Sequence, residues 1–165
     1  MLGLTELGAL HTLLSVVALA TGLVAMAVDR QILTTNKRGQ IYLASTFLVA
    51  FSGLFIYTRG VFGPGHVASV LTLIALPVGI VLAYKPLLGG VSRYISVAAL
   101  TLTFLFHLIA GTTETLIRVP PSAPMVTSLE SPLLQNALRG CGVLFLVTVA
   151  LQWWMLKRRS TRSHE

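Results

Sequence analysis

Charged residues are scarce in this 165-residue chain: they make up 10% of it, against 55% hydrophobic residues. A soluble domain covers its surface with about 25% charged residues, so this composition argues against a soluble protein. Cysteine is almost absent as well. The single Cys141 excludes an intramolecular disulfide and any CxxC metal or redox motif. The chain also lacks a Walker loop, a GxSxG and an HExxH motif, which argues against the common soluble nucleotide-binding and hydrolase classes.

Long apolar runs dominate what is present, and the mean hydropathy is +0.83. A transmembrane helix needs about 20 apolar residues, because the hydrocarbon core of a bilayer is roughly 30 Å thick. The runs predict an all-α integral membrane bundle of five transmembrane helices, over residues 7–28, 41–58, 66–84, 93–117 and 132–156. We expect a single domain over residues 1–165, with a basic tail over 157–165. The first run has no basic segment before it and carries Glu6 and His11, so we expect a retained helix rather than a cleaved signal peptide.

The basic residues are distributed unevenly between the two sides of the predicted bundle. Nine of the twelve lie on the side that holds the carboxyl terminus, and three lie on the other side: Arg59, Arg118 and Arg139. Basic loops stay in the cytoplasm, so we expect the amino terminus outside and the carboxyl terminus inside, in a bacterial cytoplasmic (inner) membrane. Topology then explains the sequence pI of about 10.4. We expect the basic residues to interact with the lipid bilayer, and we expect no nucleic-acid partner.

Three of the four histidines lie in or at predicted helices, where ionisable groups are costly and tend to mark function. In the expected orientation, His11, His66 and His107 all fall in the outer half of the membrane, whereas His164 lies in the tail. Two stripes at helical spacing accompany them. The stripe on the first predicted helix has small residues that admit a close helix or a flat cofactor; it consists of His11, Ser15, Ala18 and Gly22. The stripe on the fourth predicted helix is polar and consists of Thr103, His107, Gly111, Glu114 and Arg118.

Imidazole binds zinc, copper and haem iron, so our main hypothesis is a membrane-embedded haem- or metal-binding protein. Two histidines on facing helices could ligate haem b axially, and three basic side chains could pair with its propionates or another anion: Arg59, Arg118 and Arg139. We expect His11 and His107 to be the ligands, with His66 third. Such a protein would serve electron transfer with a membrane redox partner, or assemble as a homo-oligomer. Because a polar stripe must face the bundle, we also expect His107 and Gly111 to be buried against protein.

Other interpretations fit the same residues. Three histidines with an open fourth position suit a catalytic metal, and Glu114 is then a candidate general base of a metal-dependent hydrolase. Alternatively, the protein is a non-catalytic membrane subunit or small transporter, whose histidines serve packing or proton handling. A plain salt bridge between Glu114 and Arg118 explains that pair equally well, and Tyr42 is interpreted as an interface anchor. Whether the protein is an enzyme stays open at this point.

Three short motifs carry a resemblance to a known family: the run from Leu10 to Gly22, the segment KRGQIY from Lys37 to Tyr42, and FGPGH at residues 62–66. Over roughly residues 10–110 the chain resembles a family of small bacterial multi-helix membrane proteins, known only as a domain of unknown function. The resemblance implies a histidine opening the first helix, one in a basic turn, and others in later helices. This chain has Thr35-Asn36 where the turn histidine would be. The family has no established activity, so the resemblance supports the topology more than any chemistry.

Overall fold

The computed structural model describes residues 5–57 and 62–162, and this part of the chain contains helices and no strand. The elements are α1 (Glu6–Val28), α2 (Lys37–Gly53), α3 (Pro64–Tyr84), the short 3-10 helix η1 (Gly89–Val91), α4 (Ser92–Arg118) and α5 (Pro132–Arg162). The predicted all-α class is confirmed, and a helix overlaps each of the five predicted segments.

Local sequence signals explain where several helices begin. Asn36 caps α2, because its side-chain oxygen accepts a hydrogen bond from the Gly39 N–H at 2.8 Å. The helix therefore begins at 37 rather than at the predicted 41, and it ends at 53 rather than at 58. Both α3 and α5 begin with a proline, which needs no amide hydrogen in the first helical turn. The carboxyl-terminal helix runs past the predicted end at 156 to 162.

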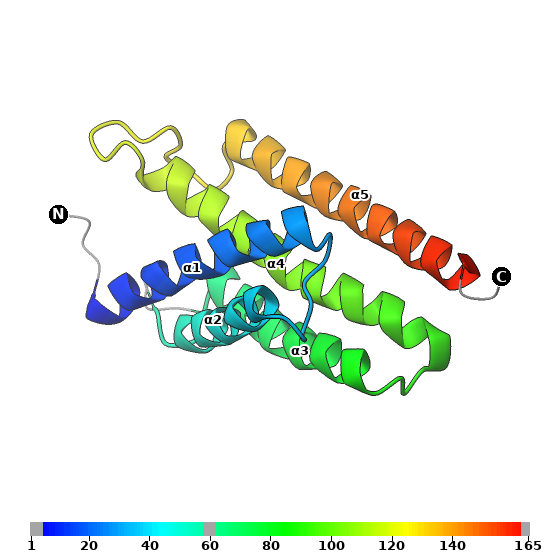
Figure 1. The fold of residues 1–165 in the computed structure, drawn as a ribbon. Helices are drawn as coiled ribbons and strands as arrows, with labels where there is room; N and C mark the ends of the chain where they lie inside the picture. The colour runs from blue at the N-terminus through cyan, green and yellow to red at the C-terminus, as the bar shows by residue number, and fades with distance from the viewer. Residues whose placement is uncertain (1–4, 58–61, 163–165) are drawn as a thin grey trace.

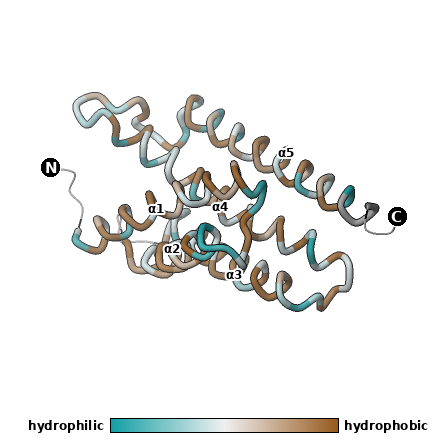
Figure 2. The backbone as a smooth tube through the Cα atoms, in the orientation of Figure 1, coloured by the Kyte–Doolittle hydropathy of each residue, from teal (hydrophilic) through white to brown (hydrophobic). Residues whose placement is uncertain are grey.

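Within residues 5–57 and 62–162, four helices are long and apolar enough to cross a membrane: α1, α3, α4 together with η1, and α5. The remaining helix, α2, has 17 residues and two basic residues in its first turn. Large apolar side chains are exposed along the helices, with Leu13, Val16 and Leu146 at 60% or more. Figure 2 shows apolar colouring along much of the helices and a hydrophilic stretch where α1 connects to α2. Surface of this kind requires lipid or protein to cover it, as in a multi-pass membrane protein.

Helix α4 runs through the middle of the bundle (Figure 1), with α3 and α5 packed along it and α1 crossing it. The other close pairs are α1 with α2 and α2 with α3. Two ends of the bundle matter below. We call the end formed by the start of α1, the end of α2, the start of α3 and the end of α4 the histidine end. The opposite end, which includes the α1–α2 connection, η1 and the end of α5, is the basic end.

The small-residue stripe on α1 is a packing surface. Ala18 is fully buried and Gly22 is buried, and a Cβ added at Gly22 would lie 2.6 Å from Phe104 Cδ2 and 2.9 Å from Tyr42 Cε2. Two aromatic rings therefore fill the space beside Gly22 that a flat cofactor could have used. These rings belong to the main core cluster, which also includes Ala25, Ile32, Leu43, Leu76 and Leu100.

Candidate functional site

His11, on α1, is held by a hydroxyl of α2. Its Nδ1 lies 2.9 Å from Ser52 Oγ. The Ser52 hydroxyl hydrogen is already used, because it donates to the carbonyl oxygens of Leu48 at 2.7 Å and Val49 at 3.1 Å. A hydroxyl has one hydrogen, so with that hydrogen on a carbonyl oxygen, Ser52 accepts and His11 Nδ1 donates. The Nε2 atom of the half-buried neutral ring then carries the lone pair that can take a proton or bind a metal.

His107, on α4, belongs to a buried network. It is 7% exposed, its Nε2 lies 3.1 Å from Thr46 Oγ1 of α2, and its ring meets the edge of Tyr42 at a centroid distance of 6.0 Å. The Thr103 hydroxyl donates to the Leu100 carbonyl oxygen at 2.7 Å, so the Tyr42 hydroxyl is the donor in its 2.7 Å bond to Thr103. Two hydrogen-bonded pairs, Tyr42 with Thr103 and Thr46 with His107, therefore join α2 to α4.

His11 and His107 interact electrostatically, but they bond to different faces of α2. Thr46 and Ser52 are six residues apart, which corresponds to about 9 Å along a helix and about 120° around it. Two nitrogens that share one metal ion must each lie about 2 Å from it. Among residues 5–57 and 62–162, no three His, Cys, Asp or Glu side chains are grouped so that they could hold a metal ion. The ligand roles of the histidines stay predictions.

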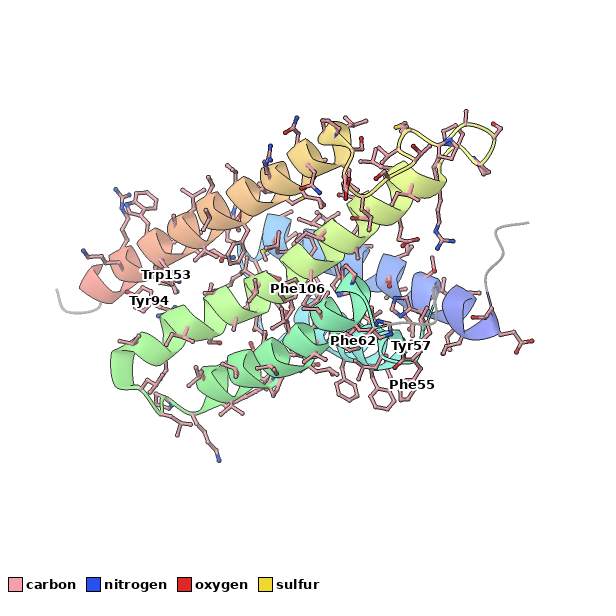
Figure 3. The ribbon with its side chains drawn as sticks, turned by 180° about the vertical axis from the view of Figure 1, so that it is seen from behind. Phe55, Tyr57, Phe62, Tyr94, Phe106 and Trp153 are labelled. Atoms are coloured by element: carbon pink, nitrogen blue, oxygen red, sulfur yellow. The ribbon has the colours of Figure 1, made fainter. Side chains whose placement is uncertain are left out.

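His66 lies in the first turn of α3, two residues after the helix begins at Pro64, and the residue is 5% exposed. Its Nδ1 accepts the Gly63 N–H at 3.1 Å. The ring lies against Tyr57 and Phe62, with centroid distances of 4.5 and 4.9 Å, and both aromatic side chains are labelled in Figure 3. Because Nδ1 is an acceptor, the neutral ring carries its hydrogen on Nε2, which is buried and has no hydrogen-bond partner in the described part of the chain. In this tautomer His66 has no lone pair free for a metal.

The charged candidates already have neighbours. Glu114 and Arg118 form an ion pair one turn apart on α4, with side chains 61% and 38% exposed. Glu114 also interacts electrostatically with His11. Arg139 donates to the Asn136 side-chain oxygen at 3.0 Å, whereas Arg59 lies outside the described residues. A propionate or another anion would have to replace these contacts, and Glu114 would have to leave Arg118 to act as a general base.

The polar stripe on α4 is only partly buried. Thr103 and His107 face the bundle, as the stripe predicts. The predicted burial of Gly111 is wrong: this residue is exposed, and a Cβ added to it would have no atom within 4 Å. Helical spacing identifies one face of a helix, but it does not say how far along that face the neighbouring helices reach. The polar stripe therefore leaves the core one turn beyond His107.

Sequence reasoning missed the part that α2 plays. The interpretation of Tyr42 as an interface anchor is wrong, since its side chain is fully buried and hydrogen-bonded to Thr103. Thr46 and Ser52, which bond the two histidines, were not singled out either. The available signal was the set of hydroxyl residues inside an otherwise apolar helix: Ser45, Thr46 and Ser52.

Comparison with known proteins adds nothing to this geometry: no family model, no curated protein and no solved structure matches the chain. The resemblance to a family of unknown function stays a prediction. What the site can do must therefore be inferred from its own chemistry. It offers a half-buried imidazole with a free lone pair near a carboxylate, next to a buried polar network that contains a second imidazole.

Proposed function

We propose that the chain crosses a bacterial cytoplasmic membrane five times, with its amino terminus outside. Four helices have the required length and hydropathy. The fifth, α2, has 17 residues, and its length of about 26 Å approaches the roughly 30 Å of a hydrocarbon core. Among the described residues, the only acid at the basic end is Asp29, which is bonded to Arg38. This excess of basic residues supports a cytoplasmic location for the basic end.

Within this topology, we propose that the histidine end handles protons, as part of a small transporter or a non-catalytic membrane subunit. The observation that carries the proposal is the state of His11: its Nδ1–H is committed to Ser52, and its Nε2 lone pair is free to accept a proton. Glu114 of α4 lies close enough to interact electrostatically with this ring. The ring is only half buried, so protons can reach it from the histidine end.

The buried network supports the same proposal. Imidazole and hydroxyl groups are the types of side chain that relay protons inside membrane proteins. Tyr42, Thr46, Thr103 and His107 bring such groups into the apolar core between α2 and α4. A network used only for packing would be as stable with apolar residues of the same shape, because hydrogen bonds contribute little net stability.

Proton flux into vesicles tests this function. The purified protein is reconstituted into potassium-loaded liposomes that contain a pH-sensitive dye, and valinomycin then makes the interior negative. We expect faster internal acidification than in protein-free vesicles, and a loss of most of this flux in His11→Gln. His164→Gln, in the basic tail, is the matched control and should conduct like the parent protein. A parent flux equal to that of empty vesicles, or full flux in His11→Gln, would refute the proposal.

A second function, a haem or metal centre for electron transfer, is favoured by one observation. Imidazoles that bind metals through Nε2 usually donate Nδ1–H to a neighbouring oxygen, which is the arrangement of His11 and Ser52. Protein purified in mild detergent would then show a Soret band or a stoichiometric transition metal. Bound cofactor should be lost at acid pH, because ligation needs neutral imidazole. A colourless, metal-free preparation would exclude this second function.

The two functions differ in whether His11 and His107 act as a unit. If they share a cofactor, removal of either one abolishes binding, and the stability losses of His11→Ala and His107→Ala are strongly non-additive. If each histidine keeps its separate hydrogen bond to α2, the two losses should add within about 0.5 kcal/mol, as for independent sites. Equilibrium unfolding of the two single variants and the double variant distinguishes the cases.

A further inference from the structure

A cavity of about 530 Å³ opens at the basic end, between the α1–α2 connection, the end of α3, η1 and the start of α4. Its size falls in the range of about 300–1,000 Å³ that is typical of small-molecule sites. One wall is apolar and reaches into the core, with the side chains of Ile32, Leu33, Leu82, Val97, Leu100 and Leu156. Such a wall suits a hydrocarbon chain better than a small polar ligand.

The other side of the cavity is polar and basic. Arg93 lines it, together with Thr34, Thr35 and Ser92. Its side chain is exposed and forms no ion pair in the described part of the chain. Asp29, the only described acid at this end, already bonds Arg38 through both carboxylate oxygens, at 2.7 and 3.0 Å. The cavity therefore offers a basic side chain that no carboxylate of residues 5–57 and 62–162 neutralises.

The walls are held by bonds within the protein, so the cavity does not have to be formed by its ligand. The Ser96 hydroxyl donates to the Gly79 carbonyl oxygen of α3 at 2.7 Å. The Ser92 hydroxyl oxygen accepts the Leu88 N–H at 2.9 Å, which fixes the turn before α4. The backbone oxygen of Thr34 accepts bonds from Gln40 and Tyr84, both at 3.3 Å. A preformed site loses less conformational entropy on binding.

We propose that this cavity binds one anionic phospholipid, with the phosphate at Arg93 and an acyl chain along the apolar wall. The inference rests on the combination, in one cavity, of an apolar wall and a basic side chain that has no ion-pair partner among the described residues. Basic pockets between helices at the cytoplasmic side are known to recognise anionic lipid headgroups. An inorganic phosphate would share the chemistry of the headgroup but would use only the polar side. A zwitterionic lipid would bring a positive charge next to Arg93.

Two substitutions separate charge from shape. Arg93→Gln removes the positive charge, and because the side chain is exposed the fold should tolerate it. Gly90→Leu places a bulky side chain at the cavity that Gly90 lines, and its Cβ itself has no atom within 4 Å. The matched controls are Arg139→Gln, at the other end of the bundle, and Gly142→Leu, on α5, whose Cβ also has open space.

Native mass spectrometry of the full chain in mild detergent measures the binding. We expect one phosphatidylglycerol molecule to be retained in preference to phosphatidylcholine at equal concentration. Arg93→Gln should weaken phosphatidylglycerol binding about fivefold, the equivalent of the roughly 1 kcal/mol that a basic residue contributes near a lipid headgroup. Gly90→Leu should abolish the retained molecule. Both controls should bind like the parent protein, and unfolding temperatures without lipid should be unchanged in all four variants.

Other outcomes would overturn the proposal. Equal retention of the two lipids would remove the role of charge, and unchanged binding in Gly90→Leu would place the lipid elsewhere. Displacement of phosphatidylglycerol by millimolar inorganic phosphate would show that the anion alone is recognised and that the apolar wall is not used. None of these measurements depends on the histidine end, so they test the cavity independently of proton flux or cofactor binding.

Discussion

Gly22→Ala tests the contact at which α1 meets both α2 and α4. The new Cβ would lie 2.6 Å from Phe104 Cδ2 and 2.9 Å from Tyr42 Cε2, whereas carbon atoms in good contact are about 3.5–4.0 Å apart. Neither ring can move easily. Phe104 is 7% exposed, and the fully buried Tyr42 is tied to Thr103 by its hydroxyl. The added methyl group must therefore push α1 outward or force a ring away from its preferred rotamer.

The change in stability caused by Gly22→Ala is best compared with that of a matched variant. Gly111→Ala makes the same chemical change within α4, but its Cβ has no atom within 4 Å. Replacing glycine by alanine inside a helix stabilises it by about 0.5–1 kcal/mol, and both variants gain this amount. Overpacking a core typically costs about 1–3 kcal/mol, and only Gly22→Ala carries that cost. We therefore expect Gly22→Ala to be about 1–3 kcal/mol less stable than Gly111→Ala.

Equilibrium unfolding in mixed micelles, followed by tryptophan fluorescence, measures this difference. Both tryptophans, Trp153 and Trp154, lie on α5 and are unchanged in the two variants. The expected order of stability is Gly111→Ala, then the parent protein, then Gly22→Ala. If Gly22→Ala proves as stable as Gly111→Ala, α1 does not pack against the two rings at this distance, and the arrangement of α1, α2 and α4 is wrong.

Three further predictions concern α5, the topology and the α1–α2 connection. Gln152→Leu removes the side-chain oxygen that accepts a hydrogen bond from the buried Thr101 hydroxyl at 2.9 Å. The free energy of unfolding should fall by about 1–3 kcal/mol. An unchanged value would mean that α5 is not anchored at this point. A cysteine at Ser122 should react with an impermeant maleimide in intact cells, and one at the exposed Thr35 should not; the reverse pattern would invert the topology. The hydrogen bond from the Arg38 guanidinium lowers the pKa of Asp29 below 3.8. The ionised Asp29 carboxylate therefore stabilises the fold above that pH, and this stabilisation is lost as the pH falls through the lower pKa of the folded state. In acid unfolding of Asp29→Asn, the loss of unfolding free energy that comes from protonation of Asp29 should be absent.

Hydropathy predicted the positions of the helices more accurately than it predicted their ends. The starts of α3 and α5, two helices that each begin with a proline, were predicted to within two residues. The end of α2 was misplaced by five residues, because the apolar residues continue from Leu54 to Ile56 while the regular α-helical hydrogen bonds stop at Gly53. An apolar segment can lie in lipid without being part of a helix when its backbone finds other partners, so hydropathy does not determine the last helical residue.

At the histidine end, too, the sequence predicted part of the arrangement but not its contacts. Sequence spacing placed His107 on the buried face of α4, and it identified the surface of α1 that packs around Gly22. It could not predict which side chain bonds each histidine, because that depends on which helix lies beside α1 and α4. The structure gives this role to α2, whose Ser52 bonds His11 and whose Thr46 bonds His107.

The role of α2 changes what a functional experiment should vary. Replacing a histidine removes the titratable group, its hydrogen bond and its packing at once, so a loss of function has several possible causes. Ser52→Ala keeps the His11 ring and removes the acceptor of its Nδ1–H, together with the bonds of the Ser52 hydroxyl to its own helix; the ring is then free to adopt the other tautomer. Proton acceptance at Nε2 requires the tautomer that Ser52 selects, whereas a structural histidine needs only to fill its place. Activity that depends on Ser52 as strongly as on His11 would therefore locate the chemistry at that one imidazole nitrogen.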